Sequence, residues 1–321
     1  MRKFSFYLIC ILLCFIAFAL IYNPSRYISV CYQAIILWAV NVLPSLLPFF
    51  FLTLLLTYLD AVNMLAKLFS PITAIIYRTS GYASVVQLMS FVSGYPVGAK
   101  LISELYNAKQ INSDEATRIS TFSSTSGPMF IIGSVGVGMF KNSLVGALLL
   151  IAHLISAILN GILFRKYGAC KCINTPIKNK SYQGNILYDC AYNTTLSCLI
   201  IGTFIAFFNV FCQIVIDFNL LYPLIWIFNL IFKNKNLSMG LITGLIECTN
   251  GCFILSANPN TLSVALAGFL ISFGGLCIIL QSIAFLKQAN VNIKIFILSK
   301  IIQGLTTFTL LALLSPIFIC F

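Results

Sequence analysis

The sequence predicts an all-α polytopic membrane protein with about seven spanning helices, arranged as an inverted repeat with two re-entrant helical hairpins and two interrupted transmembrane helices. Of the 321 residues, 60% are hydrophobic and only 8% are charged, whereas about 25% of residues are charged in soluble proteins. Apolar runs of roughly 20 residues, the length that crosses a bilayer core, recur from end to end. Polar and helix-breaking residues interrupt these runs at matching places in two halves of the chain.

The first apolar run follows Arg2 and Lys3 directly and is predicted to be a retained transmembrane helix over residues 4–22. It is longer than the apolar segment of a secretory signal peptide, and no small-residue cleavage site follows it. Residues 1–30 therefore form an N-terminal transmembrane helix and a short external loop. Further spans are expected near residues 31–59, 119–140, 144–164, 190–217, 261–286 and 295–319.

The basic residues predict how the chain is oriented. With a cytoplasmic N-terminus, 15 of the 19 Lys and Arg residues lie at or near the inner side, Lys100, Arg118 and Lys300 among them. Cytoplasmic loops of membrane proteins are enriched in Lys and Arg, so the reverse orientation is disfavoured. The basic residues 165–189 are then a cytoplasmic connector between the two halves. The residues expected outside are Arg26, Lys141, Lys233 and Lys235.

Residues 82–110 are predicted to form the first re-entrant hairpin. The segment is apolar at its start but is interrupted by SGYPVGAK. Pro96 removes a backbone donor and fixes its own φ angle. Gly94 and Gly98 each cost about 1 kcal/mol in a helix interior. A continuous helix is therefore disfavoured, and the segment is expected to enter the membrane, turn at its polar tip and leave on the same side.

Residues 237–260 are predicted to form the second hairpin, with Asn250 and Gly251 at its centre. Glu247 precedes them within an apolar segment. Ionisable residues inside a membrane are costly and are functional by default, which favours a functional role over simple packing between helices. A carboxylate at this depth needs polar groups around it, and those at the interruptions are expected to supply them.

The order of elements repeats between the two halves. The first repeat, residues 31–164, consists of a span, an interfacial helix, hairpin 82–110 and two spans. The second repeat, residues 190–321, consists of a span, an interfacial helix, hairpin 237–260 and two spans. Because each unit holds an odd number of spans, the two units must have opposite orientations, and one hairpin enters from inside and the other from outside.

The span that follows each hairpin is also interrupted. Pro128 and the preceding residues interrupt the first, and Ser272, Gly274 and Gly275 interrupt the second. Unwound backbone at membrane depth is tolerated only where it is buried in protein or lines a wet cavity. Two tips and two interrupted helices therefore predict one central polar site, which is how secondary transporters commonly build a midplane site.

Other residues give no sign of a metal or catalytic centre. The twelve cysteines are scattered through apolar runs, where cysteine behaves as a small hydrophobe. The single histidine, His153, is expected to make an interhelical contact and is assigned no role. The motifs GxSxG and HExxH are absent, so no enzyme is predicted. No cofactor is expected beyond a coupling ion, H⁺ or Na⁺.

The tract FVSGYPVGAKLISELYNAKQINSDEATRISTFSSTSGPMFIIGSVGVGMF, followed later by GLIECTNGC, resembles the YlbJ-type sporulation integral membrane proteins, bacterial relatives of the nucleoside-recognition, or Gate, domain proteins. The resemblance implies a role in endospore formation, moving dipicolinic acid from the mother cell towards the forespore across the outer forespore membrane. It also implies similarity to the concentrative nucleoside transporters in the plan of hairpins and broken helices. The chain departs from those transporters at the binding motifs, which argues against a nucleoside cargo.

An anion such as dipicolinate requires helix N-terminal N–H groups, hydroxyls and at least one cation. Two roles for Lys100 are given equal weight. One is substrate binding, and the other is extension of the side chain to the inner surface of the membrane. Glu247 would repel a dianion unless it is protonated, carries a coupling proton or binds a cation. The candidate substrate-binding residues are Ser93, Gly94, Tyr95, Pro96, Lys100, Ser123, Ser124, Thr125, Ser126, Gly127, Glu247, Thr249, Asn250, Gly274 and Gly275.

Two other functions stay open at this stage. One is transport of a nucleoside or another small metabolite. The other is a non-transporting scaffold in a sporulation membrane complex, which would tolerate replacement of the polar interruptions. The expected partners are a small-molecule anion, the lipid bilayer, and either a second copy of the chain or other sporulation membrane proteins. Nucleic acid is not expected, since the basic residues are explained as orientation signals.

Overall fold

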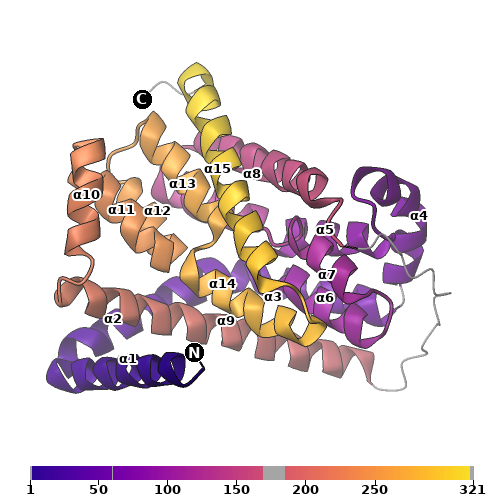
Figure 1. Ribbon diagram of the computed structural model, residues 1–321, viewed down its shortest axis with the longest axis horizontal. Coiled ribbons are helices and arrows are strands. Elements are labelled where there is room, and N and C mark those ends of the chain that lie inside the picture. The colour runs from indigo at the N-terminus through magenta and orange to yellow at the C-terminus, as the bar shows by residue number, and fades with distance from the viewer. Residues whose placement is uncertain (1, 60, 169–184, 319–321) are drawn as a thin grey trace.

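The computed structural model describes residues 2–59, 61–168 and 185–318 as helices joined by short turns, with no strand among them (Figure 1). The elements are α1 (Arg2–Tyr22), α2 (Pro24–Leu37), η1 (Trp38–Val42), α3 (Leu43–Tyr58), α4 (Ala61–Ile76), α5 (Tyr82–Ser93), α6 (Val97–Asn107), α7 (Ser113–Ser120), η2 (Met129–Met139), α8 (Ser143–Phe164), α9 (Ile186–Asp217), α10 (Tyr222–Phe232), α11 (Lys235–Ile246), α12 (Cys248–Leu255), α13 (Thr261–Phe273), α14 (Gly275–Leu286), η3 (Lys287–Ala289) and α15 (Ile293–Phe318).

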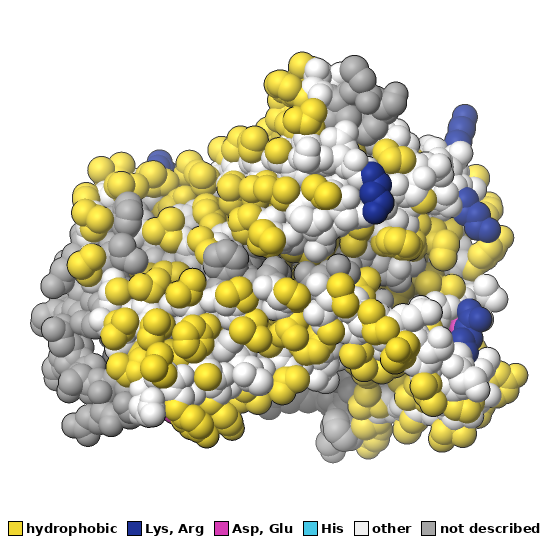
Figure 2. Space-filling model, turned by 180° about the vertical axis from the view of Figure 1, so that it is seen from behind, with side chains coloured by type: hydrophobic (Ala, Val, Ile, Leu, Met, Phe, Trp, Pro, Cys, Tyr) yellow, Lys and Arg dark blue, Asp and Glu magenta, His cyan; other side chains and the backbone are white. Residues whose placement is uncertain are grey.

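Four helical stretches in the described part of the chain are long and apolar enough to cross a membrane: α8, α9, Thr261–Ala289 and α15. The pair α1 and α2 is bent by 105° and forms a fifth if it is one span. Hydrophobic side chains cover much of the face in Figure 2, where Lys and Arg are few and gather mostly towards the right-hand side. The predicted all-helical membrane fold is confirmed, whereas seven spans and opposite orientations of the halves stay predictions.

Both segments predicted as hairpins form two helices joined by a tight turn. Helices α5 and α6 meet at Gly94, and α11 and α12 meet at Glu247. In the second pair, a Cβ atom added to Gly251 would contact Gly244, and one added to Gly240 would contact Leu255. This pairing shows that α11 and α12 run antiparallel in close contact, because glycines allow the two backbones to approach. Entry and exit on one side of a membrane stays a prediction.

The second turn differs in position from the prediction. Asn250 and Gly251, expected at the centre of the hairpin, lie inside α12, and the chain turns at Glu247 instead. Glu247 has extended backbone angles, φ −136° and ψ 111°, between two helices. Its carboxylate accepts hydrogen bonds from the first N–H groups of α12, which stabilises a helix start at this residue. Gly251 is needed for close packing of the two helices rather than for the turn.

Both predicted interruptions are present. Residues 121–128 separate α7 from η2 without regular helix, and Gly274 separates α13 from α14. Gly274 has a φ angle of +90° and Gly275 one of +67°. This backbone is accessible to glycine and strained for other residues. The interruptions are therefore built into the sequence by proline in the first half and by two glycines in the second.

The helices of the two halves correspond in order. Helix α4 packs on α5 as α10 packs on α11, whereas the last helices of the halves pack on opposite sides of the interruptions: α8 on η2, which follows the first, and α15 on α13, which precedes the second. The halves meet through α3 with α9 and through α8 with α15. They also exchange contacts at the centre, where α6 packs on α14 and α12 contacts η2. This arrangement places the two turns and the two interruptions together in the middle of the protein.

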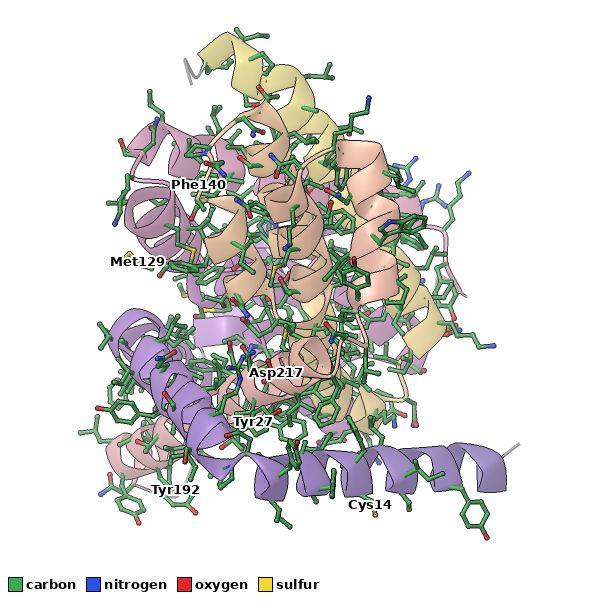
Figure 3. All side chains as sticks on the ribbon, turned by 90° about the vertical axis from the view of Figure 1, so that its left-hand side faces the viewer. Cys14, Tyr27, Met129, Phe140, Tyr192 and Asp217 are labelled. Atoms are coloured by element: carbon green, nitrogen blue, oxygen red, sulfur yellow. The ribbon has the colours of Figure 1, made fainter. Side chains whose placement is uncertain are left out.

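Two observations concern the ends of helix α9. Most of the predicted connector, residues 165–189, lies outside the described residues, which resume at residue 185. At the opposite end of α9, Arg26 of α2 donates to both carboxylate oxygens of Asp217 over 2.5 and 2.6 Å. Figure 3 shows Asp217 near Tyr27, the neighbour of Arg26. This ion pair joins the segment before the first repeat to the first helix of the second.

Candidate functional site

The two turns and the starts of η2 and α14 meet around a cavity of about 80 Å³. Binding sites for drug-sized molecules usually enclose about 300–1,000 Å³, so this cavity is smaller than a typical site. The cavity also has apolar walls from α3 and α9. Its lining residues are Val42, Leu46, Val92, Ser93, Gly94, Tyr95, Ser126, Gly127, Met129, Phe130, Ile201, Ile205, Glu247, Thr249, Cys277, Ile278 and Gln281.

The first turn, residues 93–96 (the first tip), packs directly on the first interruption, residues 121–128 (the first break). Gly94 has a φ angle of +80°, and a Cβ atom there would lie 2.6 Å from the backbone nitrogen of Gly127. Gly98 lies equally close to the first break, where its Cβ atom would collide with the carbonyl oxygen of Ser123. No side chain fits at either position. The glycines of SGYPVGAK therefore let the first tip contact bare backbone.

The second turn, residues 246–249 (the second tip), packs in the same way on the second interruption, centred on Gly274 (the second break). A Cβ atom on Gly275 would lie 2.9 Å from the carbonyl oxygen of Gly244 and 3.2 Å from that of Ile246. The two halves thus use the same contact, in which a hairpin turn meets the unwound part of the following span. In each case glycine is needed for the approach.

Glu247 connects the second tip to the cavity. Its side chain is buried, 2% exposed, and lines the cavity wall. Its carboxylate accepts hydrogen bonds from the backbone N–H groups of Thr249, at 3.0 Å, and Asn250, at 2.8 Å. Hydrogen bonds to an ionised group and the positive end of the α12 dipole both favour a negative charge here. Glu247 is therefore both a helix cap and the acid of the cavity.

Lys300 of α15 places an ammonium group at the centre of the protein, behind the cavity wall. The side chain is fully buried. Its Nζ atom donates to the carbonyl oxygen of Ser124 at 2.7 Å, to the hydroxyl of Tyr95 at 2.8 Å and to Oε1 of Gln303 at 3.1 Å. It also lies 4.9 Å from the centre of the Tyr95 ring. One ammonium thus binds the first tip and the first break together.

Tyr95 extends this network to the second half. Its hydroxyl donates towards the carbonyl oxygens of Ile271 and Ser272, at 3.2 and 3.3 Å. These carbonyls lose helical partners because the helix ends at the second break. Unpaired backbone groups cost several kcal/mol away from water, so a partner supplied by Tyr95 stabilises the interruption. Tyr95 therefore lines the cavity and holds both broken spans.

His153 of α8 forms a second bridge between the two breaks. The backbone N–H of Ser126 donates to Nε2 of His153 at 3.0 Å. Because Nε2 accepts, the ring proton belongs on Nδ1, which lies 2.7 Å from Oγ of Ser272. Oγ of Ser272 lies 2.7 Å from Oγ1 of Thr307 in α15. The predicted interhelical contact of His153 is present, and it joins the same two breaks that Lys300 and Tyr95 join.

The predicted site residues fall into three groups. Those that line the cavity are Ser93, Gly94, Tyr95, Ser126, Gly127, Glu247 and Thr249. Those packed behind this wall at the tips and breaks are Pro96, Ser123, Ser124, Thr125, Asn250, Gly274 and Gly275. Lys100 is separate, because its Nζ atom donates to Oγ of Ser197 in α9 at 3.1 Å and it does not line the cavity. The cation near the site comes from another helix.

Lys300 was missed as a site residue. It was counted among the basic residues at or near the inner side, and its side chain is fully buried against the first break. Oxygens at the first break and first tip solvate the ammonium, so it has no need to reach the surface. Its position in IFILSKIIQGL, a charge inside an apolar run with glutamine three residues later, was the available signal. Gln303 and the cavity residue Gln281 were also missed, although each is a polar residue inside an apolar run.

N-terminal ends of helices line the cavity, and C-terminal ends of helices lie behind its wall. The first turns of η2, α12 and α14 and the first tip, which leads into α6, all line the cavity. Helix N-termini carry unpaired N–H groups and a partial positive charge. The carbonyls that follow α7 and end α13 instead face Lys300 and Tyr95. At the start of α12 these N–H groups already donate to the carboxylate of Glu247.

Comparisons with known proteins agree with this architecture. Residues 39–142, from η1 to the end of η2, match the family model Gate, described as nucleoside recognition. The chain is 28% identical over 332 aligned residues to the sporulation integral membrane protein YlbJ of Bacillus subtilis (strain 168), covering 95% of this chain and 81% of the relative. No solved structure matches. The chain is therefore an integral membrane protein with a Gate segment that resembles the YlbJ-type sporulation proteins along nearly its whole length.

Proposed function

We propose that this protein is a secondary transporter that moves a small organic anion, with dipicolinic acid as the preferred cargo, across the mother-cell-derived outer forespore membrane during endospore formation. The observation that supports this function best is the convergence of several helix starts on one small cavity between two breaks. The similarity to a sporulation membrane protein supports the cellular setting.

The cavity offers the chemistry that a small aromatic dicarboxylate requires. Hydroxyl-bearing Ser93, Ser126 and Thr249 line it, as does the amide of Gln281. The N–H groups of the helix starts are suited to carboxylate oxygens. The apolar side chains of Phe130 and Ile201 on the opposite wall suit an aromatic ring. The Lys300 ammonium, one layer behind Tyr95, adds a positive potential.

Glu247 sets a condition on the cargo. A dianion entering this cavity meets a buried carboxylate, and like charges in a low-dielectric site repel strongly. Glu247 must therefore be neutralised when the anion is bound. A coupling proton on Glu247 meets this requirement, because its protonation would remove the repulsion and link cargo movement to proton movement. A bound Na⁺ beside Glu247 is the alternative form of neutralisation.

The small volume of the cavity also implies a conformational change. At about 80 Å³ it is smaller than a typical small-molecule site. Each tip touches the break of its own half through glycine backbone, so separation of one tip from its break would open the cavity without unfolding a helix. Alternating opening of the two tips is the movement that we expect in the transport cycle.

Flux measurements in vesicles test the proposal. Purified full-length protein is reconstituted, and uptake of labelled dipicolinate and of labelled uridine is measured with and without a proton gradient. We expect dipicolinate uptake that saturates and responds to the gradient, and no uridine uptake above that of empty vesicles. Folded protein that moves neither compound would favour the scaffold function. Uridine uptake alone would favour the second candidate, a nucleoside transporter, which the Gate match supports.

A further inference from the structure

We propose that the oxygens around Lys300 form a monovalent-cation site whose cation is the ammonium of the lysine itself. Transport by this protein then requires no dissociable Na⁺ at the first break. The inference rests on the proposed function, since it specifies how the transport cycle is coupled. It also makes a separate statement about ion binding that can be measured without any cargo.

The surroundings of Nζ are those of a coordinated ion. Three oxygens of three different kinds lie within 3.1 Å: the backbone carbonyl of Ser124, the phenol of Tyr95 and the amide of Gln303. They come from the first break, the first tip and the next turn of α15. Carbonyls of unwound backbone and the C-terminal ends of half-helices coordinate alkali cations in membrane transporters. Here a lysine side chain enters such a place from α15.

The charge of Lys300 is balanced by dipoles rather than by a counter-ion. Among residues 2–59, 61–168 and 185–318, no carboxylate oxygen pairs with Nζ within 4.0 Å. A buried charge is costly unless it is hydrogen-bonded throughout. The carbonyl of Ser124, beyond the C-terminus of α7, lies at the negative end of a helix dipole and so favours a cation. The site therefore selects positive charge by its backbone geometry.

Unused oxygens lie in the same break. The hydroxyls of Ser124 and Thr125 are buried and have no hydrogen-bond partner within the described part of the chain. The amide of Gln303 presents its oxygen to the ammonium, although its Nε2 atom then has no partner among the same residues. These groups would add to the coordination of a free ion if the ammonium were removed.

Because the cation is covalently part of the chain, the central contacts do not depend on the concentration of a free ion. Nζ holds the first tip to the first break through Tyr95 and Ser124, and Tyr95 in turn binds the carbonyls of the second break. A dissociable ion at this place would make these contacts depend on its concentration. The lysine makes them independent of the concentration of any ion. The driving ion must then act elsewhere, which leaves Glu247 as the group that changes its charge.

The first experiment measures ion binding without cargo. Lys300→Ala removes the ammonium and leaves space for an ion, whereas Lys300→Met removes the charge and fills the space. The melting temperature of each full-length protein in detergent is followed as NaCl replaces choline chloride at constant ionic strength. We expect a saturable rise of about 3 °C or more for Lys300→Ala only. Wild type, Lys300→Met and the control Lys100→Ala should not respond.

The second experiment measures dipicolinate uptake by the same proteins in vesicles. Wild-type uptake should be equal in Na⁺ and choline media. Lys300→Ala should lose about tenfold or more of its rate in choline and regain part of it in Na⁺ or methylammonium. Lys300→Met should stay inactive in both. This restoration distinguishes a cation site from a lysine that is needed only for packing.

Three results would overturn the inference. One is a folded Lys300→Ala protein whose melting temperature ignores Na⁺, K⁺ and methylammonium. Another is an equal response of Lys300→Met. The third is a Na⁺-dependent stability of the wild-type protein that persists in Glu247→Gln, because Na⁺ at Glu247 cannot then account for it. If no compound is transported but Lys300→Ala alone responds to cations, the cation site is supported and the proposed cargo is wrong.

Discussion

The two halves of the protein use one backbone arrangement with opposite charges. In the first half the tip meets its break at Gly94 and Gly127, and in the second half the tip meets its break at Gly275. A cation from α15, Lys300, binds the first pair. An acid in the second tip itself, Glu247, caps the following helix. The contact between tip and break is repeated, but the charged chemistry is not.

This difference distinguishes the residues that hold the protein together from the residue that couples transport to an ion. The glycine contacts occur in both halves and are needed to close the cavity. Lys300 lies behind Tyr95, does not line the cavity and is surrounded by fixed oxygens. Glu247 lines the cavity and is held by groups at the start of its own helix, among them the N–H groups of Thr249 and Asn250. We infer that the first tip and the first break hold a fixed positive charge that α15 supplies, and that the second tip supplies the charge that changes.

The largest expected effect comes from filling a contact between tip and break. Gly94→Val and Gly275→Val each place a side chain against backbone at a positive φ angle. Each should destabilise the protein by about 3 kcal/mol or more. Gly133→Val in η2 is the control, because a Cβ atom there meets nothing within 4 Å. The measurement is the yield of monodisperse protein and its melting temperature.

If Gly94→Val and Gly275→Val differ in stability, the two halves do not depend equally on the contact between tip and break. Wild-type folding of Gly94→Val with loss of Gly275→Val would mean that only the second half depends on its tip. The halves would then be similar in outline alone. Equal losses, with Gly133→Val unaffected, would confirm that the same backbone contact supports both halves.

The next effect concerns the acid of the second tip. Glu247→Gln keeps the size of the side chain and one oxygen acceptor but removes the charge and the titration. An acid at the bilayer centre costs about 3 kcal/mol on insertion scales, so membrane insertion should be normal or improved. Transport of dipicolinate should fall by about tenfold or more, because the coupling step is lost. Uptake in vesicles measures this change.

Glu104→Gln is the matched control for that variant. Glu104 is a half-buried acid on a hairpin helix, α6, and does not line the cavity. Its substitution should leave uptake close to that of wild type. Wild-type rates for Glu247→Gln over a range of pH would show that the carboxylate only caps α12. The scaffold function would then gain support.

An intermediate effect is expected at His153, which connects the two breaks rather than belonging to either. His153→Leu fills the space but leaves the N–H of Ser126 and the hydroxyl of Ser272 without their partner. A buried group that loses its partner costs about 1–3 kcal/mol, which a thermal melt can detect. Thr306→Val is the control, since the hydroxyl of Thr306 bonds only carbonyls of its own helix. Equal stability of the two variants would contradict a bridging role.

The fold could be predicted from the sequence where residue type dictates backbone. Pro96 and Pro128 cannot continue a helix, and Gly274 with Gly275 marked the second break. The exact turn of the second hairpin could not be predicted in this way. Asn250 and Gly251 are ordinary turn residues, and only the packing of α12 against α11 shows that Gly251 is used for close contact instead.

The central cation could not be predicted for a different reason. Counting basic residues assumes that each lysine prefers water, and this assumption holds for most of them. Lys300 departs from it because the first break supplies a carbonyl and the first tip supplies a phenol. Those groups lie more than 170 residues away in the sequence. A long-range contact of this kind leaves no local pattern, so the charge that matters most to the site was counted as a signal of topology.

The smallest effect is expected at the rim, where Arg26, in the helix that leads into the first repeat, pairs with Asp217 of the second half. If the halves are held together at the centre by Lys300, Tyr95 and His153, this pair should matter little. The Arg26 side chain is half-exposed, and exposed ion pairs contribute about 0–1 kcal/mol and weaken as salt screens them. A double-mutant cycle with Arg26→Ala and Asp217→Asn, measured by thermal melts at low and high salt, gives the coupling directly. Because Gln213 also donates to Asp217, the Asp217→Asn single variant should cost slightly more than Arg26→Ala. A coupling above about 2 kcal/mol that persists in high salt would place the main link between the halves at the rim, and the central contacts between tips and breaks would then be free to open.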